Sequence, residues 1–252
     1  SNASRMLGPT LGGVLLALLG LDGTFVLATL LYLPALIAAI LLPQTARSTA
    51  SQPAPVLARI AEGLAAVRAD KRLSGTLMIT LIYNLFGWPF TSMIPVIGKD
   101  QLALGPEGVG ILASMDGVGA LLGAVLITLF IGPALYRRCY LGGVTLYMVM
   151  VIAFAMIPNP WLAGLALILV GIGGSGFGIM QPTLIYLATP VELRSRVLGL
   201  LSVCIGMGPI GFVGLGIAAE LLGAPIATAL MAACGLVALA VTHRYWKHIS
   251  GG

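Results

Sequence analysis

Asp116 is the residue whose type and position most clearly suggest chemistry. It is a carboxylate inside a long apolar stretch, residues 109–135. An ionised aspartate at the centre of an apolar span costs at least ~2.5 kcal/mol, so such residues usually face a cavity. We expect Asp116 to be a proton-coupling or substrate-contacting acid. The alternative is an aspartate that reaches water near the end of its span, because it follows Glu107 by only nine residues.

A second candidate site lies in the apolar stretch at residues 73–97. Its polar and aromatic side chains follow i, i+4, i+7, i+8 spacing, which places them on one face of a regular helix: Asn84, Trp88, Thr91 and Ser92. Such a face could line a substrate cavity, with Trp88 stacking on a flat ligand. It could equally make hydrogen bonds between helices, worth only ~0.6 kcal/mol each on average. Pro89 and Pro95 are predicted to kink this helix.

Gln181 is the remaining candidate, an uncharged polar residue before Pro182 in the apolar stretch at residues 161–188. It either contacts substrate or bonds backbone groups that the proline leaves free. Nearby, GIGGSG at residues 171–176 matches G-x-G-x-x-G, but it lies inside an apolar helix with no preceding strand. A dinucleotide site needs that strand, so we interpret these glycines as helix-packing residues.

Other reactive residue types form no recognisable site. The two histidines are five residues apart, which does not place them on one helix face, and the three cysteines are scattered along the chain. We therefore expect no metal, no disulfide and no cofactor. No Ser/His/Asp set, His cluster or pair of carboxylates can be assembled, so an enzyme is not expected either.

The composition predicts the class of protein. Of the 252 residues, 59% are hydrophobic and 8% are charged, and the mean hydropathy is +1.06. A soluble domain has about 25% charged residues. The 13 basic and 8 acidic residues could not cover a globule in water. This excludes a soluble enzyme, a nucleic-acid-binding protein and a disordered chain, and it predicts an all-α integral membrane protein in a lipid bilayer.

We predict about eight transmembrane helices from the apolar stretches. Alternate loops carry the basic residues, and only Lys99 of the 13 lies on the opposite side. The positive-inside rule then places both termini of this chain in the cytoplasm, with the helices in a bacterial inner membrane. The predicted spans are residues 6–21, 25–42, 73–97, 109–135, 140–157, 161–188, 197–222 and 225–242.

The loop after the second span is expected to divide the chain. Residues 43–55 are rich in Pro, Ser, Thr and Ala, which is typical of a flexible linker. Residues 56–70 have apolar residues at helical spacing and predict an amphipathic helix on the cytoplasmic membrane face. The resulting division is residues 1–3 as the remnant of an affinity tag, 4–42 as two helices of an N-terminal bundle, 43–72 as the linker with its amphipathic helix, 73–245 as a six-helix bundle and 246–252 as a cytoplasmic tail.

An internal repeat is consistent with this division. The Gly-Pro pair at residues 8–9 recurs 200 residues later at 208–209, and Gly23 and Gly223 share that spacing. One copy of the repeat would contain six helices, as is typical of secondary transporters. The first span would then be a fifth helix, and we expect four more helices before Ser4. The small residues predicted to serve helix packing are Gly8, Pro9, Gly12, Gly13, Gly208 and Pro209.

Three segments resemble the major facilitator superfamily, near its enterobactin-exporter-like branch. Residues 8–13 resemble the fifth-helix motif of proton-coupled exporters, and residues 95–97 through 117–124 resemble the seventh and eighth helices. Residues 189–197, TPVELRSRV, resemble a tenth-to-eleventh loop that usually reads Pro-x-Glu-Leu-Arg-Gly-Arg-Val, with Ser195 replacing the glycine. The family's acidic-and-basic loop motif is reduced here to Gly132 and an Arg pair in residues 131–138.

The resemblance implies that this chain corresponds to helices 5 to 12 of an exporter. It implies alternating access around a cavity between two bundles, and proton-coupled efflux of a small molecule such as a siderophore-like compound or an amphipathic drug. Since that cavity needs both bundles, we expect residues 4–252 alone not to transport, and we expect the exposed inner faces of the first two spans to favour dimers by helix exchange. The alternative is a non-transporting membrane scaffold or a subunit of a larger complex; such a protein would not need the polar face at residues 84–92 or Asp116.

Overall fold

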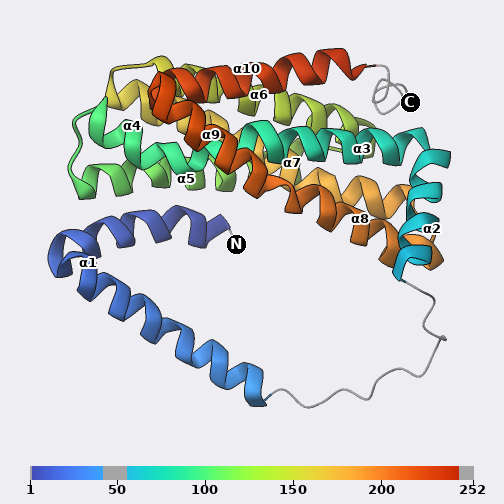
Figure 1. Ribbon diagram of the computed structural model, residues 1–252, viewed down its shortest axis with the longest axis horizontal. Helices are drawn as coiled ribbons and strands as arrows, with labels where there is room; N and C mark the ends of the chain where they lie inside the picture. The colour runs from blue at the N-terminus through green and yellow to red at the C-terminus, as the bar shows by residue number, and fades with distance from the viewer. Residues whose placement is uncertain (1, 42–55, 244–252) are drawn as a thin grey trace.

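The computed structural model describes residues 2–41 and 56–243, and Figure 1 shows how its helices are arranged. Within these ranges every regular element is a helix, as predicted for the all-α class. The elements are α1 (Asn2–Leu41), α2 (Val56–Ala69), α3 (Lys71–Ile82), η1 (Tyr83–Gly87), η2 (Trp88–Met93), α4 (Ile94–Asp100), α5 (Pro106–Phe130), η3 (Pro133–Leu135), α6 (Tyr136–Met156), α7 (Pro160–Ala188), η4 (Val191–Leu193), α8 (Arg194–Gly206), α9 (Gly208–Leu222) and α10 (Ala224–Val241).

Seven segments of the described chain are long and apolar enough to cross a membrane. They match seven of the eight predicted spans, which confirms the membrane class. The expected first span, residues 6–21, forms the first arm of α1 and is not one of the seven. The seven segments are Leu18–Leu41, Lys71–Asp100, Pro106–Phe130, Pro133–Met156, Pro160–Ala188, Val191–Leu222 and Ala224–Val241.

α1 consists of two arms that meet at Gly20, whose φ of 66° lies in the left-handed region that glycine adopts without steric cost. The sequence predicted this boundary near Gly23, by analogy with Gly223. Gly223 does end α9, with a φ of 82°, but the break in α1 comes three residues earlier than the repeat requires. The first arm packs against α5, whereas the second arm stands away from the bundle, and none of its apolar window is buried (Figure 1).

Glycines allow the central helices of the bundle to pack closely. At the crossing of α5 and α7, Gly119 faces the carbonyl oxygen of Ile168, and Gly171 faces that of Asp116. A β-carbon at either glycine would collide with backbone atoms. Gly173 likewise lies against Gly143 of α6, where an added β-carbon would be 2.6 Å from the carbonyl oxygen. The structure therefore agrees with helix packing for the glycine-rich run at residues 171–176, which lies wholly inside α7.

The predicted amphipathic segment at residues 56–70 corresponds to helix α2, which packs against α8 and α3. Val67 is buried in a small apolar cluster with Leu77 of α3 and Val197 of α8. Glu62 forms an ion pair with Arg196 at 2.7 Å. α2 therefore packs across the first turns of α3 and α8, at the end of the bundle that carries arginines, while the linker at residues 43–55 lies outside the described residues.

Candidate functional site

The helix that carries Asn84 and Trp88 is irregular, and its predicted polar side chains lie in different surroundings. α3 continues as a π-helix at Tyr83–Gly87 and as a 3₁₀-helix at Trp88–Met93. The period therefore departs from 3.6 residues, and in the 3₁₀ part residues three apart, such as Trp88 and Thr91, eclipse each other. Asn84 is buried at 4% exposure, whereas Trp88 is 39% exposed and Ser92 is exposed. The four residues thus differ in burial, and their role as one face of a substrate cavity stays a prediction.

The residues after the π-helix mostly serve the helix itself. The hydroxyls of Thr91 and Ser92 donate to the carbonyl oxygens of Trp88 and Pro89, at 3.0 and 2.8 Å. They satisfy backbone acceptors at the irregular turns around Pro89. The Trp88 ring meets Phe212 of α9 edge-on, with ring centroids 5.3 Å apart.

The small residues predicted for helix packing lie in two places. At the start of α9, Gly208 is buried, and a β-carbon there would be 2.8 Å from the Trp88 ring. Pro209 follows it in the first turn of α9, a position that proline suits. Gly12 of α1 lines a cavity beside Pro95 and Val109. Gly8, Pro9 and Gly13 are helical in α1, and their surroundings lie outside the description.

Asn84 belongs instead to a buried polar cluster centred on Thr80. The Asn84 side-chain nitrogen donates to the Thr80 carbonyl oxygen at 2.9 Å, and the Gln181 amide of α7 donates to the Thr80 hydroxyl at 3.0 Å. The Tyr140 hydroxyl of α6 lies 3.0 Å from the same Thr80 oxygen and donates to the carbonyl oxygen of Thr76, also at 3.0 Å. Hydrogen bonds thus join three spans around one threonine.

Sequence reasoning identified Asn84 and Gln181 but missed Thr76, Thr80 and Tyr140. The signal was present in part, since Thr76, Thr80 and Asn84 follow each other at intervals of four residues. Thr76 and Thr80 are 2% and 0% exposed. The Gln181 amide nitrogen reaches across to the Thr80 hydroxyl of α3 rather than to the backbone around Pro182.

Aromatic rings pack beside this polar cluster. Tyr83 stacks on Phe177 with ring centroids 3.8 Å apart, and the Tyr140 ring lies nearly parallel to that of Phe177, with centroids 5.7 Å apart. Tyr147 tilts against Tyr83 at 4.7 Å. Because such rings pack best in a few fixed geometries, they hold α3, α6 and α7 in register around the hydrogen-bonded residues.

Asp116 lies where α5 crosses α7, and its residue is 7% exposed. Both interpretations of Asp116, a coupling acid and an aspartate that reaches water near the end of its span, stay predictions. Its carbonyl oxygen faces Gly171, and one turn further along α7 Gly174 faces Tyr147 and Tyr83. The backbone of Asp116 thus contacts α7 one turn from the glycine that faces these aromatic rings.

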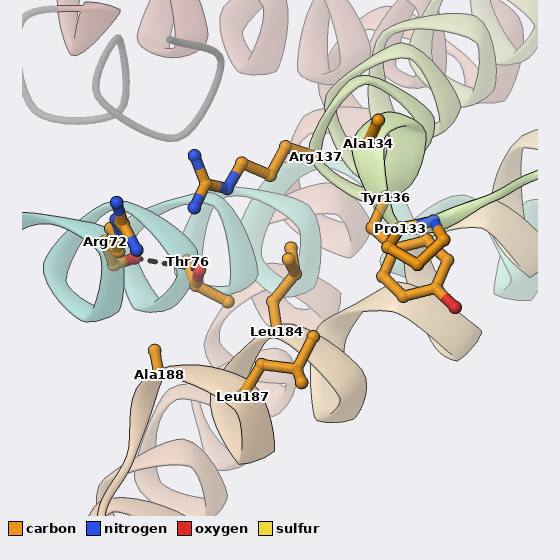
Figure 2. A pocket seen from close by; sticks show the side chains of 9 residues that line it. All are labelled: Arg72, Thr76, Pro133, Ala134, Tyr136, Arg137, Leu184, Leu187 and Ala188. Atoms are coloured by element: carbon orange, nitrogen blue, oxygen red, sulfur yellow. Dashed lines mark hydrogen bonds between the residues drawn. The ribbon is translucent and has the colours of Figure 1, made fainter. Parts of the chain in front are cut away.

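A cavity of about 320 Å³ opens at the end of the bundle that carries arginines, between α3, η3, α6 and α7 (Figure 2). We call this end, with Arg72, Arg137, Arg194 and Arg196, the basic end. Thr76 belongs both to the cavity wall and to the Thr80 cluster, so the cavity leads toward the buried polar groups. The lining residues are Arg72, Thr76, Pro133, Ala134, Tyr136, Arg137, Leu184, Leu187 and Ala188.

Residues 1–249 match the family model described as transmembrane secretion effector, a branch of the major facilitator superfamily. The chain belongs to this superfamily. No curated protein sequence matches it. Among solved structures, a bacterial homologue of the human lysosomal transporter Spinster, crystallised inward-facing and unoccupied, has a TM-score of 0.55 at 15% identity. The match covers 92% of this chain and 57% of the Spinster homologue. The present chain therefore spans little more than half the length of that protein.

Proposed function

We propose that this chain is part of a secondary active transporter that exports a small molecule by proton-coupled alternating access. The observation that carries the proposal is the Thr80 cluster, in which buried polar side chains of three spans meet. Buried polar groups in membrane spans are rare, and they commonly mark substrate and proton pathways. The cavity at the basic end approaches this cluster through Thr76. Membership of the superfamily supports the same interpretation.

In this proposal the roles are divided among three spans. Asp116 binds and releases the coupling proton, since a buried carboxyl is stable in an apolar layer when it is protonated. Asn84 and Gln181 offer amide groups, and Trp88 an exposed ring edge, to a small substrate. Thr91 and Ser92 keep the irregular turns intact beside Trp88. A siderophore-like compound or an amphipathic drug fits such a mixed polar and aromatic wall.

The irregular helix supports a moving part. The π-helix and 3₁₀-helix at residues 83–93 contact α9, and Gly211 of α9 packs on the Leu85 carbonyl oxygen. π-helical turns are rare, and they are frequent at functional sites. We assign to residues 83–93 the role of the hinge about which the bundle rocks during alternating access.

The same proposal assigns the chain to particular helices of an exporter and to a membrane. Residues 4–42 would be helices five and six, and residues 73–245 would be helices seven to twelve of an enterobactin-exporter-like protein in a bacterial inner membrane, with both termini of the chain cytoplasmic. The unburied second arm of α1 supports this, because it would pack against further helices or against a second copy of the chain. We expect four upstream helices to complete the transport cavity.

Flux through proteoliposomes tests the proposal. The complete reading frame and residues 4–252 alone are reconstituted separately, and efflux of ethidium and of 2,3-dihydroxybenzoate is followed under an imposed pH gradient. Transport by the complete frame that exceeds empty liposomes, with none by residues 4–252, supports both the function and the need for upstream helices. Absence of gradient-driven flux of any probe from the complete frame, over a wider panel of catechols and amphipathic cations, would favour the scaffold alternative.

A further inference from the structure

The cavity at the basic end brings together two guanidinium groups from different helices. Arg72 is in the first turn of α3, and Arg137 is in the first turn of α6. Figure 2 shows the Arg137 side chain extending from α6 toward Arg72 along the cavity. Two cations placed this way repel each other unless an anion lies between them, and arginine binds carboxylates and phosphates through paired donors.

Two further arginines of this end, Arg194 and Arg196, already have partners. Arg194 donates to the carbonyl oxygens of Tyr186 and Thr189 at the end of α7, and Arg196 pairs with Glu62. Asp70, the carboxylate nearest to Arg72 in sequence, accepts the backbone N–H of Arg72 at 2.7 Å and so caps α3. Among residues 2–41 and 56–243, no carboxylate forms an ion pair with Arg72 or Arg137.

The opposite wall of the cavity is apolar. Leu184 and Leu187 of α7 line it with Pro133, and Leu187 is 70% exposed. The volume of about 320 Å³ lies at the lower end of the range of ligand pockets, ~300–1,000 Å³. An occupant that matches both walls has an anionic group and an apolar part. Basic pockets between spans are known to bind phospholipid headgroups as a class.

We infer that this cavity binds the phosphate-type group of an anionic amphiphile. The anionic group lies between Arg72 and Arg137, and the apolar part lies along Leu184 and Leu187. A membrane phospholipid and a soluble organic phosphate share this chemistry, and the experiment below distinguishes them. The inference holds whether or not the protein transports, because it depends only on the two arginines and the wall of α7.

The test measures lipid retained by the purified chain. Native mass spectrometry in micelles compares bound phosphatidylglycerol with bound phosphatidylcholine for the unchanged chain and for Arg72→Gln and Arg137→Gln. The matched control is Arg138→Gln, since Arg138 is exposed beside Arg137 but does not line the cavity. We expect preferential retention of phosphatidylglycerol, lowered about tenfold by either cavity substitution and unchanged by the control, as for loss of one charge-assisted hydrogen bond.

Two further arms complete the test. Glycerol phosphate is added as a competitor: displacement of the bound lipid identifies a soluble phosphate as a sufficient ligand, whereas persistence of the lipid identifies the phospholipid as the occupant. Tryptophan fluorescence during heating shows whether each variant folds, and Arg137→Lys, which keeps the charge, should retain most of the preference. Equal retention of both lipids by the unchanged chain, or an equal loss in Arg138→Gln, would overturn the inference in favour of diffuse surface charge.

Discussion

Replacing Thr80 with valine removes the hydroxyl at the centre of the buried cluster while leaving the side-chain volume almost unchanged. The hydroxyl loses its bond to the Thr76 carbonyl oxygen within its own helix, 2.9 Å long, and its two contacts with other spans, those with Gln181 Nε2 and the Tyr140 hydroxyl, each 3.0 Å long. The Asn84 bond to the Thr80 carbonyl oxygen and the Tyr140 bond to the Thr76 carbonyl oxygen do not use the hydroxyl and remain. The substitution therefore isolates the hydroxyl.

The expected loss of unfolding free energy comes mainly from the two contacts with other spans. Hydrogen bonds between membrane spans contribute ~0.6 kcal/mol on average and ~1.7 kcal/mol at most. A buried amide N–H left without an acceptor costs ~1–3 kcal/mol. Because Gln181 is buried at 7% exposure and loses its acceptor, we expect Thr80→Val to lower the free energy of unfolding by about 1–2 kcal/mol.

Equilibrium unfolding in mixed micelles, followed by tryptophan fluorescence, measures this change. The matched control is Thr145→Val in α6, an exposed threonine whose hydroxyl bonds only the Leu141 carbonyl oxygen of its own helix. A double-mutant cycle with Gln181→Leu should show a coupling energy of about 1 kcal/mol, because removing both partners leaves no unsatisfied group. The proposed role of Thr80 at the centre of the cluster would be refuted by additive changes in unfolding free energy for Thr80→Val and Gln181→Leu. A loss of unfolding free energy in Thr145→Val as large as in Thr80→Val would refute it too.

Three further changes test the packing and the site. Gly119→Ala should destabilise the chain by ~1–3 kcal/mol or prevent folding, because the new methyl group meets the Ile168 backbone. Gly178→Ala, which has open space around it, should be neutral or slightly stabilising. Thermal unfolding of the two variants distinguishes these outcomes. Gly20→Ala should cost ~1–2 kcal/mol at its φ of 66°, whereas Gly12→Ala should not, and equal melting temperatures would argue against a left-handed Gly20. Trp88→Ala should weaken binding of an aromatic substrate such as ethidium at least several-fold in a fluorescence titration, and unchanged affinity would restrict Trp88 to its contact with Phe212.

The sequence predicted the spans well because hydropathy over a whole helix is a sum over many residues. Seven predicted spans reappear with ends shifted by a few residues. The break in α1 was misplaced because Gly20 and Gly23 are both able to adopt a positive φ, and composition alone does not choose between them.

The candidate site was predicted only in part. Asn84 and Gln181 were identified because polar residues stand out in apolar stretches, and the structure joins both to Thr80. The π and 3₁₀ turns were not predicted, because the sequence pattern was interpreted as a regular helix. The cavity face shared with Trp88, Thr91 and Ser92 stays a prediction. Tyr140 could not be found from sequence, since its role depends on the packing of α6 against α3.

Proton movement coupled to substrate efflux tests the central claim most directly. Proteoliposomes that contain the complete reading frame and a trapped pH-sensitive dye are compared for the unchanged protein, Asp116→Asn and Asp100→Asn, an exposed aspartate at the end of α4 that serves as the control. We predict substrate-dependent proton uptake in the unchanged protein and in Asp100→Asn. In Asp116→Asn we predict that this proton uptake is lost while folding is retained. Undiminished coupled flux in Asp116→Asn, or substrate flux without any proton movement in the unchanged protein, would contradict it.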